Sequence, residues 1–217
     1  MQKSMTYIIQ SIILISTLSS SAMAQPKFGA TFGIISSNTF VDPDTGTGFD
    51  WKLGFTIGGV YVYPINDKLN LRSGLSITQK GSEFNSDILG LEFSSSTNLT
   101  YLTIPLLAQY KLNSSGNTPY GLGGLDIGIL MSADVETKIT GELFGINFDS
   151  DTSFSVKDSL TSTDIALSIG GGYMMEMGDA KIYVEVLYSL GLLDIDSVDD
   201  DVAIKTKALI IGIGYIF

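Results

Sequence analysis

The chain has 217 residues, of which 44% are hydrophobic and only 16% are charged, so it fits one domain that is too apolar for an ordinary soluble surface. It contains no cysteine and no histidine, which argues against disulfides, thiolate or imidazole catalysis and the usual zinc sites. The formal net charge of −11 argues against nucleic-acid binding, because neutralising phosphates requires clustered Lys and Arg. We therefore expect no enzyme, no catalytic residue, no cofactor, no metal site and no nucleic-acid partner.

Residues 1–24 are predicted to be a signal peptide. Lys3 supplies the positive charge, residues 8–18 are mostly apolar, and Ser21-Ala22-Met23-Ala24 ends in an A-x-A cleavage site. An anchoring helix would need a longer apolar core. Cleavage after Ala24 predicts an exported barrel domain over residues 25–217. No later run approaches the roughly 18 to 20 apolar residues of a spanning helix, so strands must make any membrane crossing.

The first two predicted strands, 27–36 and 51–63, each carry one apolar face. In the first, Phe28 and Phe32 alternate with small residues. In the second, Trp51, Tyr61 and Tyr63 lie at the two ends of the apolar face, and Lys52 lies on the opposite face. Aromatic residues at both ends of an apolar face are typical of membrane barrels, whose girdles lie at the two headgroup levels.

The third and fourth predicted strands, 69–78 and 98–111, follow the same alternation. Arg72 points away from the apolar face of the third strand. Pro105 interrupts the fourth strand, and because proline removes a ladder donor we expect a bulge there.

The fifth predicted strand, 119–131, has an ambiguous phase. Asp126 lies inside if Leu125 and its alternate neighbours face lipid, whereas Tyr120 and Leu122 favour the opposite phase. A bulge near residues 123–124 would reconcile the two patterns.

The last three predicted strands end the chain. Asp164 and Glu185 lie on the inner faces of segments 164–173 and 182–189, whose outer faces carry Tyr173 and Tyr188. The final segment, 208–217, alternates apolar residues up to a terminal Phe217. This ending resembles the C-terminal assembly signal of bacterial outer-membrane barrels, and it implies the barrel-assembly machinery and outer-membrane lipid as partners.

The predicted connections alternate in length. Those at 64–67, 113–118 and 176–180 are short, and those at 37–50, 81–97, 132–161 and 194–202 are long. Short periplasmic turns and long external loops produce this pattern when both termini face the periplasm. The predicted fold is therefore all-β: an eight-stranded antiparallel up-and-down transmembrane β-barrel in the bacterial outer membrane. A soluble lipocalin-like barrel is the structural alternative, but its apolar residues would point inward.

Two stretches resemble a known family. Residues 101–110, Tyr-Leu-Thr-Ile-Pro-Leu-Leu-Ala-Gln-Tyr, and the Gly-rich run Tyr-Gly-Leu-Gly-Gly at 120–124 look like the PorT-like outer-membrane β-barrel proteins. The Leu-x-Ile-Pro-Leu stretch is the sharpest motif, and the rest of the likeness is one of pattern. The resemblance implies a small outer-membrane barrel without catalytic residues. The secretion role of the founding member does not transfer with it.

The predicted site residues fall into two groups. The expected interior charges are few and of both signs: Lys52, Arg72, Asp126, Asp164 and Glu185. The expected aromatic girdle consists of Trp51, Tyr61, Tyr63, Tyr173, Tyr188, Tyr215 and Phe217. Eight strands enclose an interior just wide enough to be filled by side chains, so we expect the charges to neutralise one another in a polar core. A narrow porin-type channel for ions or small solutes is the alternative.

The predicted external loops contain the other candidate binding features, which are grouped carboxylates, two lysines and one alternating stretch. Carboxylates group at 42–44, 149–151 and 194–201, but none matches an EF-hand loop, so solvated charge is preferred to calcium binding. Lys205 and Lys207 reach the external rim, where snorkelling explains them. The stretch 133–159 still alternates in places, which indicates protruding strands whose edge could pair with an extended partner. The expected role is structural, surface-interacting or accessory to secretion or assembly.

Overall fold

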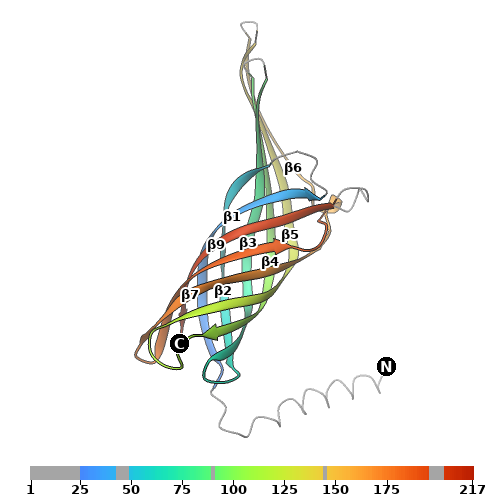
Figure 1. Cartoon of the computed structure of the whole chain (residues 1–217). Helices are drawn as coiled ribbons and strands as arrows, with labels where there is room; N and C mark the ends of the chain where they lie inside the picture. The colour runs from blue at the N-terminus through green and yellow to red at the C-terminus, as the bar shows by residue number, and fades with distance from the viewer. Residues whose placement is uncertain (1–24, 43–48, 89–90, 144–145, 196–202) are drawn as a thin grey trace, which may run out of the picture.

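The computed structural model describes residues 25–42, 49–88, 91–143, 146–195 and 203–217. Its elements are β1 (Lys27–Asp42), β2 (Asp50–Pro64), β3 (Leu69–Ile88), β4 (Leu91–Lys111), β5 (Thr118–Leu143), β6 (Ile146–Ser155), the 3₁₀ turn η1 (Lys157–Ser159), β7 (Thr163–Met177), β8 (Ala180–Gly191) and β9 (Ala203–Ile216). Eight strands close into a ring in the order β1-β2-β3-β4-β5-β7-β8-β9, with β9 pairing back to β1 (Figure 1). Every pairing is antiparallel, which confirms the predicted fold class.

Three short turns gather at one end of the barrel, here called the short-turn end, together with Lys27 and the C-terminal Phe217 (Figure 1). In the first, the Asn66 side chain accepts hydrogen bonds from the backbone N–H groups of Lys68 (3.0 Å) and Leu69 (2.8 Å), an Asx turn that reverses the chain. The other two contain Gly116 (φ 75°) and Gly178 (φ 65°), at backbone angles that glycine adopts without strain.

The two-residue alternation separates an apolar exterior from a mixed interior on all eight barrel strands. On the outer face Leu53 is 72% exposed and Ile211 61% exposed, whereas on the inner face Ser37 and Ser168 are buried. A belt of exposed apolar side chains around a closed sheet suits hydrocarbon, because closure leaves no unpaired strand edge in the barrel wall. No helix in the described part of the chain is long and apolar enough to cross a membrane.

The structure differs from the sequence-based expectation at two strand irregularities. Pro105 stays in register with Asp126 of β5, so the bulge predicted there is wrong; instead, the β3–β4 pairing is interrupted opposite Pro105. The register shifts at Thr100/Tyr101, where β5 carries the extra residue Met131. One phase therefore holds from Thr118 to Leu130, without a bulge at 123–124.

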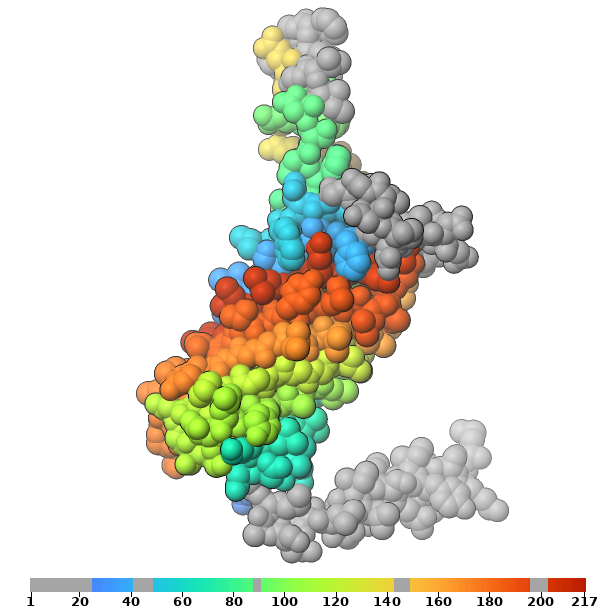
Figure 2. Space-filling model, in the orientation of Figure 1, coloured from blue at the N-terminus to red at the C-terminus, as the bar shows by residue number. Residues whose placement is uncertain are grey.

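Much of two predicted loops is strand. Residues 82–88, 91–97, 135–143 and 146–155 continue the sheet beyond the barrel wall as a four-stranded antiparallel unit, here called the extension. Figure 1 shows it rising as a narrow column from the end opposite the short turns, and Figure 2 shows its green and yellow atoms standing clear of the barrel body. The protruding strands expected within 133–159 are confirmed, whereas residues 82–88 and 91–97 were predicted as loop and become strand because their backbone groups pair with each other and with β5.

Candidate functional site

The centre of the barrel interior is a buried ion pair between β3 and β8. Arg72 donates from Nη1 to Glu185 Oε2 (2.5 Å) and from Nη2 to Glu185 Oε1 (2.7 Å), the bidentate geometry that suits a guanidinium. Tyr120 of β5 donates to Glu185 Oε2 (2.9 Å), and Arg72 Nη2 donates to the Tyr183 hydroxyl (3.0 Å). Both charged residues are 5% exposed, so each buried charge is compensated by the other and not by water.

A glycine on β9 makes room for this ion pair. The Arg72 guanidinium carbon lies 4.5 Å from the centre of the Tyr183 ring, and the same ring also lies against Gly214. A Cβ atom added at Gly214 would lie 2.1 Å from Tyr183 Cζ, which is impossible without moving the ring. The layer of Gly214, Tyr183 and Arg72 therefore requires the absence of a side chain at position 214.

A second ion pair lies closer to the long-loop end. Lys80 Nζ of β3 is 3.3 Å from Asp164 Oδ2 of β7, and Thr206 of β9 donates to the same oxygen (3.0 Å). Lys80 Nζ also lies 5.6 Å from the centre of the Tyr101 ring. Lys80 was not among the predicted interior charges, although it continues the inward alternation of Arg72 and Thr78 by one more step.

The structure places all five predicted interior charges on the inner side of the wall, but it does not bring them into one cluster. Arg72 pairs with Glu185, and Asp164 pairs with Lys80. Asp126 accepts a hydrogen bond from Ser168, and Lys52 donates to Ser96 near the base of the extension. Only one ion pair therefore joins two of the five: Asp164 pairs with a charge outside the predicted set and keeps one buried oxygen, Oδ1, without a hydrogen bond, while Asp126 and Lys52 bond to serines.

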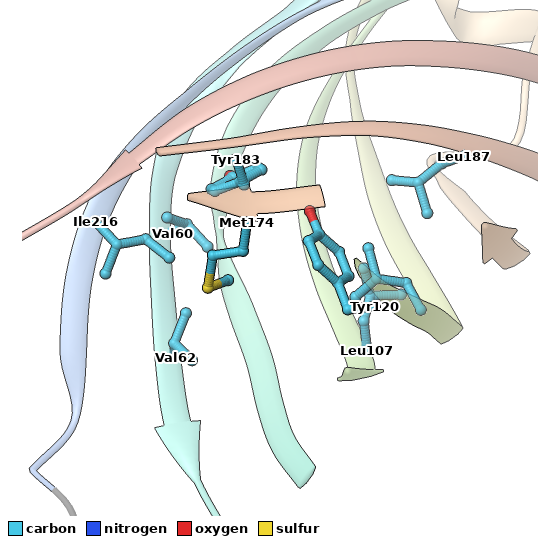
Figure 3. Close-up of a cluster of buried hydrophobic side chains, with 9 residues drawn as sticks. Val60, Val62, Leu107, Tyr120, Met174, Tyr183, Leu187 and Ile216 are labelled. Atoms are coloured by element: carbon cyan, nitrogen blue, oxygen red, sulfur yellow. The ribbon is translucent and has the colours of Figure 1, made fainter. Parts of the chain in front are cut away.

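Apolar clusters close the interior on both sides of the polar layer. Val60, Val62, Leu107, Tyr120, Leu122, Met174, Tyr183, Leu187 and Ile216 fill the lumen toward the short-turn end, where Figure 3 shows them converging from opposite walls. A second cluster of Leu99, Tyr101, Leu130, Ala133 and Ile195 lies toward the long-loop end. Between them a cavity of about 80 Å³ touches Arg72, Lys80, Asp126 and Glu185. The polar side chains of the lumen therefore lie among apolar ones.

The predicted girdle residues all lie on the outer face, near strand ends. Trp51 and Tyr188 lie toward the long-loop end, and Tyr61, Tyr63, Tyr173, Tyr215 and Phe217 lie toward the short-turn end. Lys207 Nζ lies 5.5 Å from the ring centres of both Trp51 and Phe40, so its charge sits among outward aromatic rings at the long-loop rim. This arrangement fits snorkelling toward a headgroup region.

The acidic loop stretches are only partly within the described residues. Asp149 and Asp151 lie exposed on β6 of the extension. Residues 43–48 and 196–202, which contain most of the other grouped carboxylates, lie outside the described part. Within the described ranges, no group of three or more acidic side chains is arranged to hold a metal ion.

The match to a protein-family model agrees with this architecture. Residues 21–197 match the family model described as outer membrane protein beta-barrel domain. Among solved structures, OprG from Pseudomonas aeruginosa aligns with 14% identity and a TM-score of 0.45, over 90% of this chain and 97% of that one. Ail from Yersinia pestis aligns with 18% identity and a TM-score of 0.41, over 89% and 100%. Neisserial surface protein A aligns with 15% identity and a TM-score of 0.40, over 88% and 98%. No curated protein matches the chain.

Proposed function

Because the chain belongs to the outer membrane protein beta-barrel domain family, we propose that it is a filled outer-membrane barrel that presents the extension for contact with other proteins. The observation that carries this proposal is the edge strand β6. It pairs with β5 from Ile146 to Ser155, and within the described residues it has no partner on its other side. No catalytic step is part of the proposal.

The free edge of β6 is suited to accept another strand. The backbone N–H of Val156 donates to the Ala133 carbonyl of β5. In an antiparallel ladder every second residue bonds to the partner strand, so the odd-numbered residues of β6 point their backbone N–H and C=O groups away from β5. Asp149, Asp151 and Ser153 are among the residues whose backbone groups point to the free edge. β6 contains no lysine or proline, the residues that commonly protect an edge against added strands.

A truncation tests this role. Replacing residues 136–153 with Asn-Gly would close the β5–β6 hairpin at the Val135–Phe154 pair with a two-residue turn and remove all of β6 except its last two residues. We expect the variant to fold and to reach the outer membrane, because the barrel pairings remain. Attachment of cells producing it to protein-coated surfaces should fall to the level of cells without the protein.

A point variant separates the edge from the bulk of the extension. Ser153→Pro removes one outward N–H without removing a β5–β6 hydrogen bond, so attachment should fall while the gel shift between unboiled and boiled protein is retained. Ser153→Thr is the matched control. Attachment equal to that of the unmodified protein in both the truncation and Ser153→Pro would refute the docking role.

The filled interior predicts a non-conducting barrel. Purified protein in planar bilayers should give no discrete current steps above the background of protein-free membranes, because apolar clusters lie on both sides of the polar layer. Reproducible single-channel steps from protein free of porin contamination would favour the alternative, a narrow channel for ions or small solutes.

We propose a family placement and an export route in addition. The Leu-x-Ile-Pro-Leu stretch at residues 102–106 supports a PorT-like membership. An accessory role in secretion or assembly would be one form of surface contact and does not follow from that membership. Residues 1–24 would be removed after Ala24, the short-turn end would face the periplasm, and β9 with Phe217 would address the barrel-assembly machinery. Intact mass spectrometry of outer-membrane protein should give a chain that starts at Gln25.

A further inference from the structure

Three lysines converge on the mouth of the barrel at the short-turn end. Lys27 of β1, Lys111 of β4 and Lys181 of β8 come from three separate parts of the wall, and all three lie on the inward-facing alternation of their strands. They line one pocket of about 210 Å³. The whole chain has only 12 Lys and Arg residues against 23 Asp and Glu, so this grouping runs against its overall acidity.

Apolar side chains line the same pocket beside the lysines, since Val62 is the strand partner of Lys27 and Ile216 that of Lys181. Val62, Met174 and Ile216 line it and are all buried, since they belong to the cluster that fills the lumen at this end (Figure 3). At about 30 Å³ for each water molecule, the pocket has space for about seven waters, or for one small organic molecule. A bound molecule would meet apolar side chains and positive charges together.

The positive charge is only partly neutralised by the protein itself. Lys181 forms an ion pair with Glu176 at 2.6 Å. Within the described residues, Lys27 and Lys111 have no carboxylate within ion-pair distance. At the rim, outside the spanning part of β4, partial burial and the charge of Lys181 lower the pKa of Lys111, while Asp67 and Glu176 oppose the shift. A bound anion would relieve this like-charge contact.

We propose that this lysine-rimmed pocket binds a small organic anion with an apolar body, such as a short-chain carboxylate. The carboxylate would accept hydrogen bonds from the ammonium groups of Lys27 and Lys111, and its hydrocarbon would lie on Met174 and Ile216. This site is at the opposite end of the barrel from the extension, and it stands independently of the docking role.

Methionine methyl NMR of the protein in lipid nanodiscs tests the pocket, with hexanoate as the probe. The Met174 methyl, assigned with Met174→Leu, should shift in a saturable way. The Met175 methyl is the control for hexanoate that dissolves in the lipid, because Met175 lies on the outward-facing side of the same strand. Two analogues should bind at least about tenfold more weakly than hexanoate: acetate, which lacks the apolar body, and hexanamide, which lacks the charge.

Paired charge variants supply the control. Lys27→Gln with Lys111→Gln should weaken hexanoate binding about fivefold or more, which corresponds to the upper range for single exposed ion pairs. Lys68→Gln with Lys157→Gln makes the same change in net charge outside the pocket and should leave binding unchanged. An absent Met174 shift, an equal response to hexanamide, or equal losses in both double variants would overturn the proposal.

The same experiment can distinguish two sources of the anion, a free carboxylic acid and the C-terminus of a polypeptide. The peptide Gly-Gly-Leu carries an apolar group beside a free carboxylate, as the end of a polypeptide does. Tighter binding of hexanoate supports a free acid as the ligand, whereas tighter binding of the peptide supports a polypeptide C-terminus in the same pocket.

Discussion

Replacing Arg72 with methionine is expected to lower the free energy of unfolding by about 3 to 5 kcal/mol, because it leaves the Glu185 carboxylate buried without its partner. Glu185 is 5% exposed and would keep only the Tyr120 hydroxyl of the contacts described here. Urea unfolding in lipid vesicles, followed by the fluorescence of Trp51, measures the loss, since Trp51 is the single tryptophan of the chain.

A double variant distinguishes an unpaired charge from lost packing. Arg72→Met with Glu185→Met removes both charges and should recover more than half of the lost stability, because apolar replacement of a whole buried pair is often neutral. Lys138→Met, at an exposed position of the extension, should change stability by about 0.5 kcal/mol or less. A double variant as unstable as Arg72→Met would show that shape, not charge, dominates at this site.

Replacing Gly214 with alanine is expected to cost about 1 to 3 kcal/mol, the usual range for overpacking a filled interior. The new Cβ would meet the Tyr183 ring at 2.1 Å, and moving that ring would also disturb its contact with Arg72. The same urea titration measures the effect, with the gel shift between unboiled and boiled protein as a check on folding.

Two variants show whether Tyr183 is the cause of that loss. In a Tyr183→Leu background, the added methyl group at position 214 should cost less than in the native background, because the ring that it meets is gone. Gly59→Ala is the matched glycine control on the outer face, where the nearest atom to a new Cβ is 3.8 Å away. Equal losses from Gly59→Ala and Gly214→Ala would contradict a specific clash.

Much of the barrel wall was predictable from local pattern. The alternation of Trp51 through Tyr63 against Lys52 through Val62 assigned inner and outer faces correctly, because successive side chains on a strand point to opposite sides. The turn residues and the alternation of short and long connections then led to the eight-stranded ring. These features depend on residues that are neighbours in the chain.

The phase of β5 shows where local pattern was insufficient. Tyr120 and Leu122 are apolar enough for lipid, yet they lie inside, where Tyr120 bonds to Glu185 and Leu122 joins the apolar cluster. An apolar residue suits either lipid or a filled lumen, so composition alone does not choose between them. Local pattern was also insufficient for residues 82–88 and 91–97 of the extension, which were predicted as loop and form strand because they pair with each other and with β5.

The sequence by itself determined the all-β class, the faces of every barrel strand except β5, and the inward position of Arg72, Asp164 and Glu185, because the pleat makes side-chain direction a local property. Only the tertiary structure decided which groups meet across the lumen. Lys80 of β3 pairs with Asp164 of β7, and Lys27, Lys111 and Lys181 line one pocket at the mouth although they come from three different strands. Closure and stagger of the ring set those partners, and both depend on pairings between residues far apart in the chain.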